Sequence, residues 1–445
     1  QAGGAPTQST TISQLLPNSS VSLPGLVGSV FGGSVQSGAV QVRGVDVSKA
    51  SIAAVLTNTT SPTGTYSAAL PVFRSDRSAG PSGSIVLSGI VQSTTVATEL
   101  FVQETSGISG SFRVESFDAM GNVIASRPSE AIAAFGFAEV RDAVPAGAAA
   151  VRIVNTATSG TLAGYGLISN AATGDGWAVT DPAAGSGTDE MYVVPVLHAG
   201  SGARTELYTT NRGSEVVAVS VDIVGAGSGR RRIVGHSGAR ATPPAGARAT
   251  PPASINATST LAPLQTTTTV LSASGGWVRL SAPAASVTAA ARSTVSSGAS
   301  VWGGSLPVIP FSDAMRAGDT KRFAGVDDAA AASRDGAVPA TFRTNLLLVE
   351  ASGQEAVVRV TLQFAFSGGS LATSSARVSR DYTVTANQAL LVADLARNVV
   401  GTSRDTFGDL RDMIVDVEVI SGSGRVVPFV QSFDNGTGDM IVRAE

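Results

Sequence analysis

One strand-like pattern returns three times along this chain, and its repetition restricts the possible architectures more than any other sequence feature. The clearest copy is FRTNLLLVE at Phe342–Glu350. A second copy is ARTELYTTN at Ala203–Asn211, and a weaker one is ATELFVQE at residues 97–104. Because a pattern that recurs along a chain indicates repeated structural units, we expect equivalent units that each contain this strand.

Other segments recur in a constant order around this strand. Each copy follows a tripeptide of the Leu-Pro-Val type and precedes a second alternating strand, as in a hairpin, and a third strand and a glycine turn come later. The tripeptides are residues 70–72, 194–196 and 306–308; the second strands are 112–117, 217–223 and 357–362; the third strands are 150–153, 277–280 and 414–417; the turns are 173–175, 297–299 and 437–439.

The opening of the chain matches only the second half of this repeat. Strand-like alternation occurs at residues 20–23, 39–45 and 50–56. Within it, the sequence QVRG at residues 41–44 resembles the third strand, and TGT at residues 63–65 resembles the glycine turn. The tripeptide and the hairpin that begin a complete repeat are missing.

An incomplete module at residues 1–68 needs further strands, because half a sandwich exposes unpaired strand edges and half a core. The sequence leaves three solutions open. The N-terminal tail, residues 1–20, folds back; a neighbouring domain covers the open face; or another copy of the chain supplies strands by β-augmentation.

We therefore predict an all-β protein of tandem antiparallel β-sandwich domains, of which the first is incomplete. The predicted domains are residues 1–68 (tail and half module), 69–190, 191–304 and 305–445. The third domain carries a Pro-rich insertion at residues 229–253, and the fourth carries a loop insertion at residues 312–340.

The two insertions differ in composition. GARATPPA occurs twice in succession in the first one, and paired prolines disfavour both helix and strand ladders. This segment is either a solvated loop or a polyproline ligand for a partner. In the second insertion, residues 327–333 (DDAAAAS) predict one short helix.

Composition bears on partners and compartment. Charged residues make up 14% of the 445 residues, against about 25% in typical soluble domains, and a weakly charged surface favours assembly. The net charge of −3 indicates no nucleic-acid partner, and no apolar run is long enough to predict a membrane span. Cysteine is absent, which excludes disulfides.

The first residue is Gln1 and not methionine. We interpret this as a mature end that remains after signal-peptide removal, which predicts an extracellular or cell-surface location in a bacterium. A trimmed fragment is the alternative.

The sequence contains no recognisable catalytic constellation, so we predict no enzyme activity, no catalytic residues and no cofactor. Its two histidines, His198 and His236, fit no nucleophile–base arrangement, and the common nucleotide, zinc and hydrolase motifs are missing. A glycosidase needs only two acids that are close in space, but Trp177, Trp277 and Trp302 are scattered and form no evident sugar platform.

Two weak candidate sites remain. Asp434, Asn435 and Asp439 are closely spaced oxygen ligands that could bind Ca²⁺, although Asx-Gly sequences more commonly form tight turns. The sequence at residues 170–175 partly copies this segment. Four sequons are candidate glycosylation sites, with bare surface side chains as the alternative; their asparagines are Asn18, Asn58, Asn256 and Asn435.

The order of Leu-Pro-Val, the Arg-Thr hairpin, the Val-Arg-Val strand and the closing DNGTGD resembles the tandem immunoglobulin-like or fibronectin-like β-sandwich modules of bacterial secreted and surface proteins. Arg204-Thr205 and Arg343-Thr344 match best, whereas residues 97–98 lack the arginine. The Cys and Trp hallmarks of immunoglobulin domains are absent. The resemblance implies an extracellular structural or adhesive role and carries no catalytic residues.

The favoured hypothesis is a non-catalytic structural subunit of an extracellular filament or surface coat. It would assemble head to tail with copies of itself by strand complementation or domain docking. The alternative is an adhesin stalk or carbohydrate-binding surface protein, whose partners would be glycans or other cell-surface components.

Overall fold

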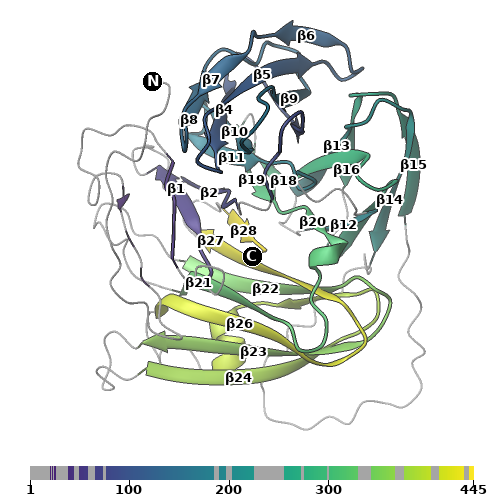
Figure 1. Cartoon of the computed structure of the whole chain (residues 1–445). Coiled ribbons are helices and arrows are strands. Elements are labelled where there is room, and N and C mark those ends of the chain that lie inside the picture. Colours follow the sequence, from purple (N-terminus) through teal and green to yellow (C-terminus); the bar gives the residue numbers. More distant parts are fainter. Residues whose placement is uncertain are drawn as a thin grey trace.

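The structure is a computed structural model of the chain. It describes residues 21, 23, 25–26, 39–44, 50–58, 66–73, 77–184, 190–196, 203–224, 255–271, 275–297, 300–328, 342–365, 375–401, 410–434 and 440–444. These residues form antiparallel β-sheets almost throughout (Figure 1), which confirms the all-β antiparallel class. The helix α2 (Leu395–Val400) is short, and so is the 3-10 turn η3 (Phe311–Asp313).

The third unit, at the C-terminal end, consists of two four-stranded sheets that face each other. One has the order β21-β26-β23-β24 and the other β25-β22-β27-β28. Leu346 and Leu348 of one sheet share a core with Val358 and Val360 of the other, because alternate side chains of a strand point to the same face. The strands are β21 (Thr320–Asp328), β22 (Phe342–Glu350), β23 (Ala356–Ala365), β24 (Ser375–Val384), β25 (Ala389–Val392), β26 (Leu410–Gly422), β27 (Val426–Asp434) and β28 (Met440–Arg443).

The first and second units contain corresponding pairs of sheets. The first unit comprises β3 (Ser84–Ser88), β4 (Val96–Glu104), β5 (Gly110–Phe117), β6 (Val123–Ser126), β7 (Glu130–Ile132), β8 (Phe137–Val140), β9 (Ala150–Asn155), β10 (Leu162–Asn170) and β11 (Asp175–Val179). The second unit comprises β12 (Met191–Pro195), β13 (Ala203–Asn211), β14 (Val217–Val224), β15 (Ile255–Leu261), β16 (Thr266–Leu271), β17 (Trp277–Ser281), β18 (Val287–Ser297), β19 (Ser300–Leu306) and β20 (Ile309–Pro310).

All three units have the same strand order. When the strands of a unit are numbered in chain order, one sheet has the spatial order first-sixth-third-fourth and the other has the order fifth-second-seventh-eighth. Two units add a detail to this scheme: β6 and β7 both take the fourth position in the first unit, and β20 pairs with β12 at the edge of the second unit. The recurring strand of the sequence is the second strand each time, namely β4, β13 and β22. The sequence repeat therefore corresponds to a repeat of topology.

The units pack tightly against one another. In the third unit the sheet that contains β22 is buried on both faces, since Leu347, Val349 and Phe429 point away from its own core into the core of the second unit. The corresponding sheet of the second unit buries Ala290 of β18 against the core of the first unit. The three sandwiches therefore form a continuous body.

The eighth strands meet at the centre of this body. β11 contacts β19, and β19 contacts β28. The N-terminal hairpin of β1 (Ala54–Asn58) and β2 (Tyr66–Leu70) completes this arrangement, because β2 contacts both β11 and β28. Figure 1 shows the result, with the hairpin, the first, the second and the third unit placed around a common centre.

Several sequence-based expectations for strands and loops differ from the structure. Residues 39–44 are described but form no strand, and of the expected strand at 50–56 only the part from Ala54 is one. Val40 and Val42 are both about half exposed, at 53% and 50%, so no buried face supports this alternation.

The loop expected at residues 312–340 contains β21, and Asp327 and Asp328, expected in a helix, end that strand. The ladder between β21 and β26 shifts register twice, which breaks the regular alternation by which a strand is recognised. The tripeptides are not equivalent either, since residues 194–196 begin inside β12 whereas residues 70–72 and 306–308 precede the first strand of their units.

Candidate functional site

A buried carboxylate closes the second strand of the first unit. Glu104 is the last residue of β4 and is 0% exposed. Its Oε1 accepts a hydrogen bond from the Ser106 N–H at 2.7 Å, and its Oε2 accepts from the N–H groups of Gly107 at 2.7 Å and Phe135 at 2.8 Å. Burial raises the pKa of Glu104, but the hydrogen bonds outweigh it and the net pKa is lowered.

The third unit repeats this arrangement at the same position. Glu350 ends β22, is 0% exposed and accepts hydrogen bonds from the N–H groups of Ser352, Gly353, Asn387 and Arg425. In both units the carboxylate folds the following Ser-Gly loop around itself. A carboxylate that accepts several hydrogen bonds from backbone N–H groups in this way holds the loop that follows its strand.

The second unit has an amide in the equivalent place. Asn211 Nδ2 donates to the carbonyls of Glu215 at 2.7 Å and Leu261 at 3.0 Å, while its Oδ1 accepts from the Gly213 N–H. The sequence-based reasoning missed these residues. The available signal was the acid or amide that ends every copy of the recurring strand, followed by a glycine or Ser-Gly.

A second polar cluster lies between the first and second units. Glu206 of β13 is 4% exposed, and its Oε2 accepts hydrogen bonds from Tyr208 Oη at 2.6 Å and Arg292 Nε at 2.5 Å. The Arg292 guanidinium also lies 4.7 Å from the ring centroid of Trp177 in the first unit. Burial raises the pKa of Glu206, but these bonds and charges lower it overall.

Another buried ion pair joins the same two units. Arg212 Nη2 lies 3.1 Å from Asp181 Oδ2, and the Asp181 side chain is 0% exposed. Arg212 also donates to the carbonyls of Ala183 and Ser84, both of the first unit. These contacts fix the orientation of the two units, so the charges of Arg212 and Asp181 hold the interface between the units together.

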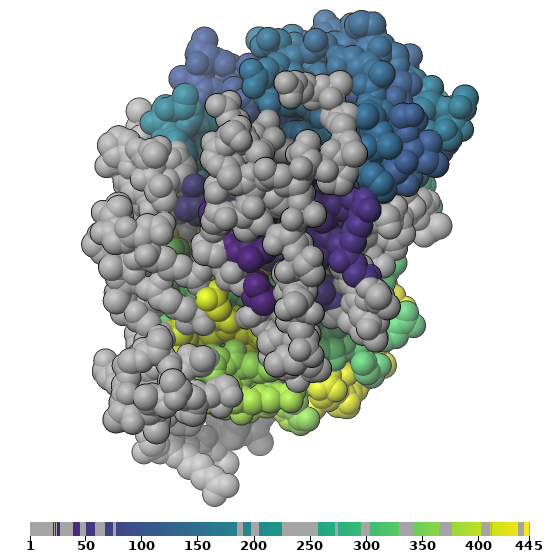
Figure 2. Space-filling view, turned by 60° about the vertical axis from the view of Figure 1, so that its left-hand side comes forward, coloured from purple at the N-terminus to yellow at the C-terminus, as the bar shows by residue number. Residues whose placement is uncertain are grey.

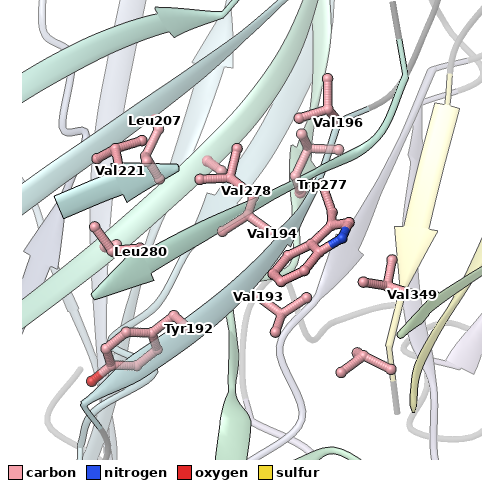
Figure 3. Close-up of a cluster of buried hydrophobic side chains, with 14 of the residues drawn as sticks. Tyr192, Val193, Val194, Val196, Leu207, Val221, Trp277, Val278, Leu280 and Val349 are labelled. Carbon is pink, nitrogen blue, oxygen red and sulfur yellow. The ribbon is translucent and has the colours of Figure 1, made fainter. Parts of the chain in front are cut away.

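The tryptophans, in which the sequence showed no evident sugar platform, do not face solvent where they are described. Trp277 is 0% and Trp177 is 5% exposed. Figure 3 shows Trp277 among the apolar side chains of the second unit and beside Val349, which comes from the third unit. Their faces are covered by protein, so neither can stack on a sugar ring. The side chain of Trp302 lies outside the described residues.

Of the three candidate Ca²⁺ ligands, the structure describes only Asp434, so the predicted site stays a prediction. Asp434 ends β27 and is 6% exposed, while Asn435 and Asp439 lie outside the described residues. In the related turn after β10, Asn170 Oδ1 accepts from the Ala172 N–H, and Asp175 Oδ2 accepts from the Gly303 N–H of the second unit at 2.7 Å. Within the described ranges, no group of three or more acids and histidines could hold a metal ion.

The sequons and histidines receive little structural definition. Asn58 ends β1, and Asn256 lies in the edge strand β15. Asn18, Asn435, His198, His236 and the Pro-rich insertion lie outside the described residues. In the part of the chain that the structure describes, no helix is long and apolar enough to cross a membrane.

Among the described residues, the N-terminal segment is rich in exposed large apolar side chains. Half of the large hydrophobic side chains that are exposed in the described residues come from the short stretch 21–72. We call them the N-terminal surface: Val21, Leu23, Val40, Val42, Val55, Leu56 and Val72, which are between 40% and 53% exposed. Figure 2 shows this segment (purple) between the first unit and the third. Exposed apolar side chains contribute to a contact surface where they lie side by side.

β1 adds an open strand edge to this surface. It pairs with β2 through the register Ala54↔Leu70 to Asn58↔Tyr66, and no other described strand pairs with it. Val55 and Leu56 are neighbours and so point to opposite faces, yet they are 46% and 48% exposed. A strand with an unpaired edge and exposed apolar side chains on both faces favours pairing with another strand.

Comparisons of the chain with protein-family models, with curated protein sequences and with solved structures found no match.

Proposed function

We propose that this chain is a non-catalytic structural subunit of an extracellular bacterial filament or surface coat. The observation that carries the proposal is the edge of β1 with which no described strand pairs, beside the exposed apolar side chains of the N-terminal surface. The three sandwiches, which we take to be immunoglobulin-like modules, provide a rigid body, and the N-terminal hairpin provides the joint.

The chemistry of the buried charges supports this assignment. Glu104, Glu206 and Glu350 are each held by several donors, and the Asp181 carboxylate is paired with Arg212. These carboxylates hold loops and join neighbouring units, as expected of a protein with a structural role. The burial of Trp177 and Trp277 weighs against the alternative of a sugar-binding surface built on these rings.

The experiment compares assembly of the full chain with that of a charged variant. We expect Val55→Lys/Leu56→Lys to abolish higher-order assembly in light scattering and negative-stain microscopy, since two lysines on β1 repel an incoming strand and solvate the edge. The matched control is Val270→Lys/Leu391→Lys, which changes the charge equally at residues that are each 52% exposed on β16 and β25.

The control should assemble like the unchanged chain. Assembly that survives the β1 variant, or that fails equally in the control, would remove the hairpin as the joint. A chain that stays monomeric at every concentration would contradict the filament itself.

A further inference from the structure

The β1–β2 hairpin occupies the position of the seventh and eighth strands of an additional unit. In the three complete units the seventh and eighth strands form an antiparallel hairpin: β10–β11, β18–β19 and β27–β28. β1 and β2 form such a hairpin too. The place of β2 in the fold makes the correspondence specific.

Contacts between eighth strands follow chain order. β11 contacts β19 and β19 contacts β28, so each eighth strand touches that of the next unit. β2 contacts β11, the next in the chain, and β28, the last described strand, and it touches β19 less extensively. A strand that precedes β11 in sequence and closes the ring beside β28 fills the role of the eighth strand of a unit before the first.

The covered outer faces agree with this assignment. The outer face of the second-strand sheet is buried under the preceding unit in the second and third units. In the first unit, Phe101 and Tyr165 stand on that face, with ring centroids 4.9 Å apart. Phe73 of the N-terminal segment lies 6.2 Å from Tyr165, and Arg43 lies over Phe135 at 4.2 Å.

The complete units show what pairs with a seventh strand. On the edge away from its eighth strand, β10 pairs with β4, β18 with β13 and β27 with β22. The partner is the second strand every time, and it runs antiparallel. The equivalent edge of β1 has no partner among the described residues.

The second strands also define the pattern that fits this edge. They share the sequence T-[EN]-L-x-x-x-[EN], at residues 98–104, 205–211 and 344–350. The threonine, the leucine and the final acid or amide are buried in every copy, with 7% or less of each side chain exposed. They lie on one face because their spacing is even.

We propose that the edge of β1 that no described strand occupies accepts an extended strand of this pattern from another polypeptide, in antiparallel pairing. The proposal rests on the structural function above and names its partner. The three second strands of this chain are each paired on both edges within their own sheets. The donor is therefore a polypeptide, a copy of this chain included, in which a segment of this pattern is not paired within its own sheet.

A synthetic peptide of residues 342–353 serves as the probe, with the full chain as receptor. We expect saturable binding by fluorescence anisotropy, and binding at least about tenfold weaker in Val55→Lys/Leu56→Lys, which corresponds to about 1.4 kcal/mol. The Val270→Lys/Leu391→Lys variant should bind like the unchanged chain. A peptide of the same sequence with alternate backbone nitrogens methylated should not bind, because it cannot form the ladder.

Cross-linking then tests the edge and the orientation. The chain contains no cysteine, so Thr57→Cys on β1 introduces a single thiol. Peptides with one cysteine near either end should form a disulfide with it at only one end if the strands are antiparallel. Circular dichroism checks that the variants are folded.

Each outcome separates this inference from the proposed function. Binding at β1 without filaments supports the inference and contradicts the filament. Filaments without peptide binding, or binding that survives backbone methylation, overturn the inference. A dimer that the β1 lysines dissociate, and that no peptide enters, would instead show that the edge pairs with β1 of a second copy.

Discussion

At the scale of single residues, three polar side chains at the end of the recurring strand hold the loops that follow it. Glu104, Asn211 and Glu350 occupy the same place in three units and are all 0% exposed. Each side chain replaces missing backbone partners in the loop that follows the strand. A buried carboxylate is tolerated at this position because several hydrogen-bond donors surround it.

We expect Glu104→Gln to lower the free energy of unfolding by about 2–3 kcal/mol, because the amide NH₂ would face N–H donors that the carboxylate now accepts. Chemical denaturation measures this change. Glu99→Gln on the same strand is the control, since Glu99 is exposed and its substitution should change the stability little. Equal effects of the two substitutions would refute the role given to Glu104.

The same residue makes stability depend on pH. The pKa of Glu104 in the folded protein lies below its ordinary value of 4.5, so its contribution is present above about pH 4.5 and is lost as the pH falls through the folded value. Glu206 contributes with the same sign. Stability measured between pH 3 and 7 should therefore fall less steeply towards acid in Glu104→Gln than in the unchanged chain.

At the scale of elements, the contact of β19 with β28 depends on a missing side chain. A Cβ at Gly304 would lie 2.5 Å from the Met440 carbonyl oxygen. Because backbone cannot easily move away, glycine is what allows the two eighth strands to approach.

Gly304→Ala should destabilise the protein by about 1–3 kcal/mol and increase amide hydrogen exchange in β28. Gly80→Ala provides the control, since a Cβ there would meet nothing within 4 Å. Unchanged exchange in residues 440–443 would show that this approach is not needed for the ring.

The elements that the sequence predicted correctly were those with unbroken alternation and a buried face. The recurring strand belongs to this kind, as in β22, where Leu346 and Leu348 enter the core. So do the two further sets of alternating strands expected from the sequence, at residues 112–117, 217–223 and 357–362 and at residues 150–153, 277–280 and 414–417. β21 was missed because Gly325, at φ +62°, and the register shifts around Val326 interrupt its pattern. Residues 39–44 were overpredicted, since alternation alone does not supply a neighbouring strand.

At the scale of the whole molecule, the repeat was predictable but the way in which the units join was not. The sequence suggested separate modules in a row. In the structure, the apolar residues between the inward positions of β22, Leu347 and Val349, belong to the core of another unit. A strand buried on both faces reads as a continuous apolar run, and nothing local tells which neighbour covers the second face. The sequence could not predict the polar contact between the first and second units at Glu206 for the same reason, because nothing local shows which unit lies against it.

The shared core predicts that the second and third units unfold together. Trp277→Ala should lower the free energy of unfolding by about 3–5 kcal/mol and split one calorimetric transition into two, because Trp277 packs with Val349 and donates from Nε1 to the Asn387 carbonyl at 3.4 Å. Phe112→Ala, in the core of the first unit, should cost a similar amount without separating the other two. Separate transitions in the unchanged chain would contradict this coupling.

The seating of β2 between β11 and β28 has a consequence for growth. A row of repeats can lengthen by one more copy at either end, whereas a closed circle has a fixed number of places. Here the first hairpin among the described residues touches β28, the last described strand, so an additional unit after β28 would have to displace β2. A larger assembly would therefore form through contacts between separate copies of the chain and not by the addition of a unit to this ring.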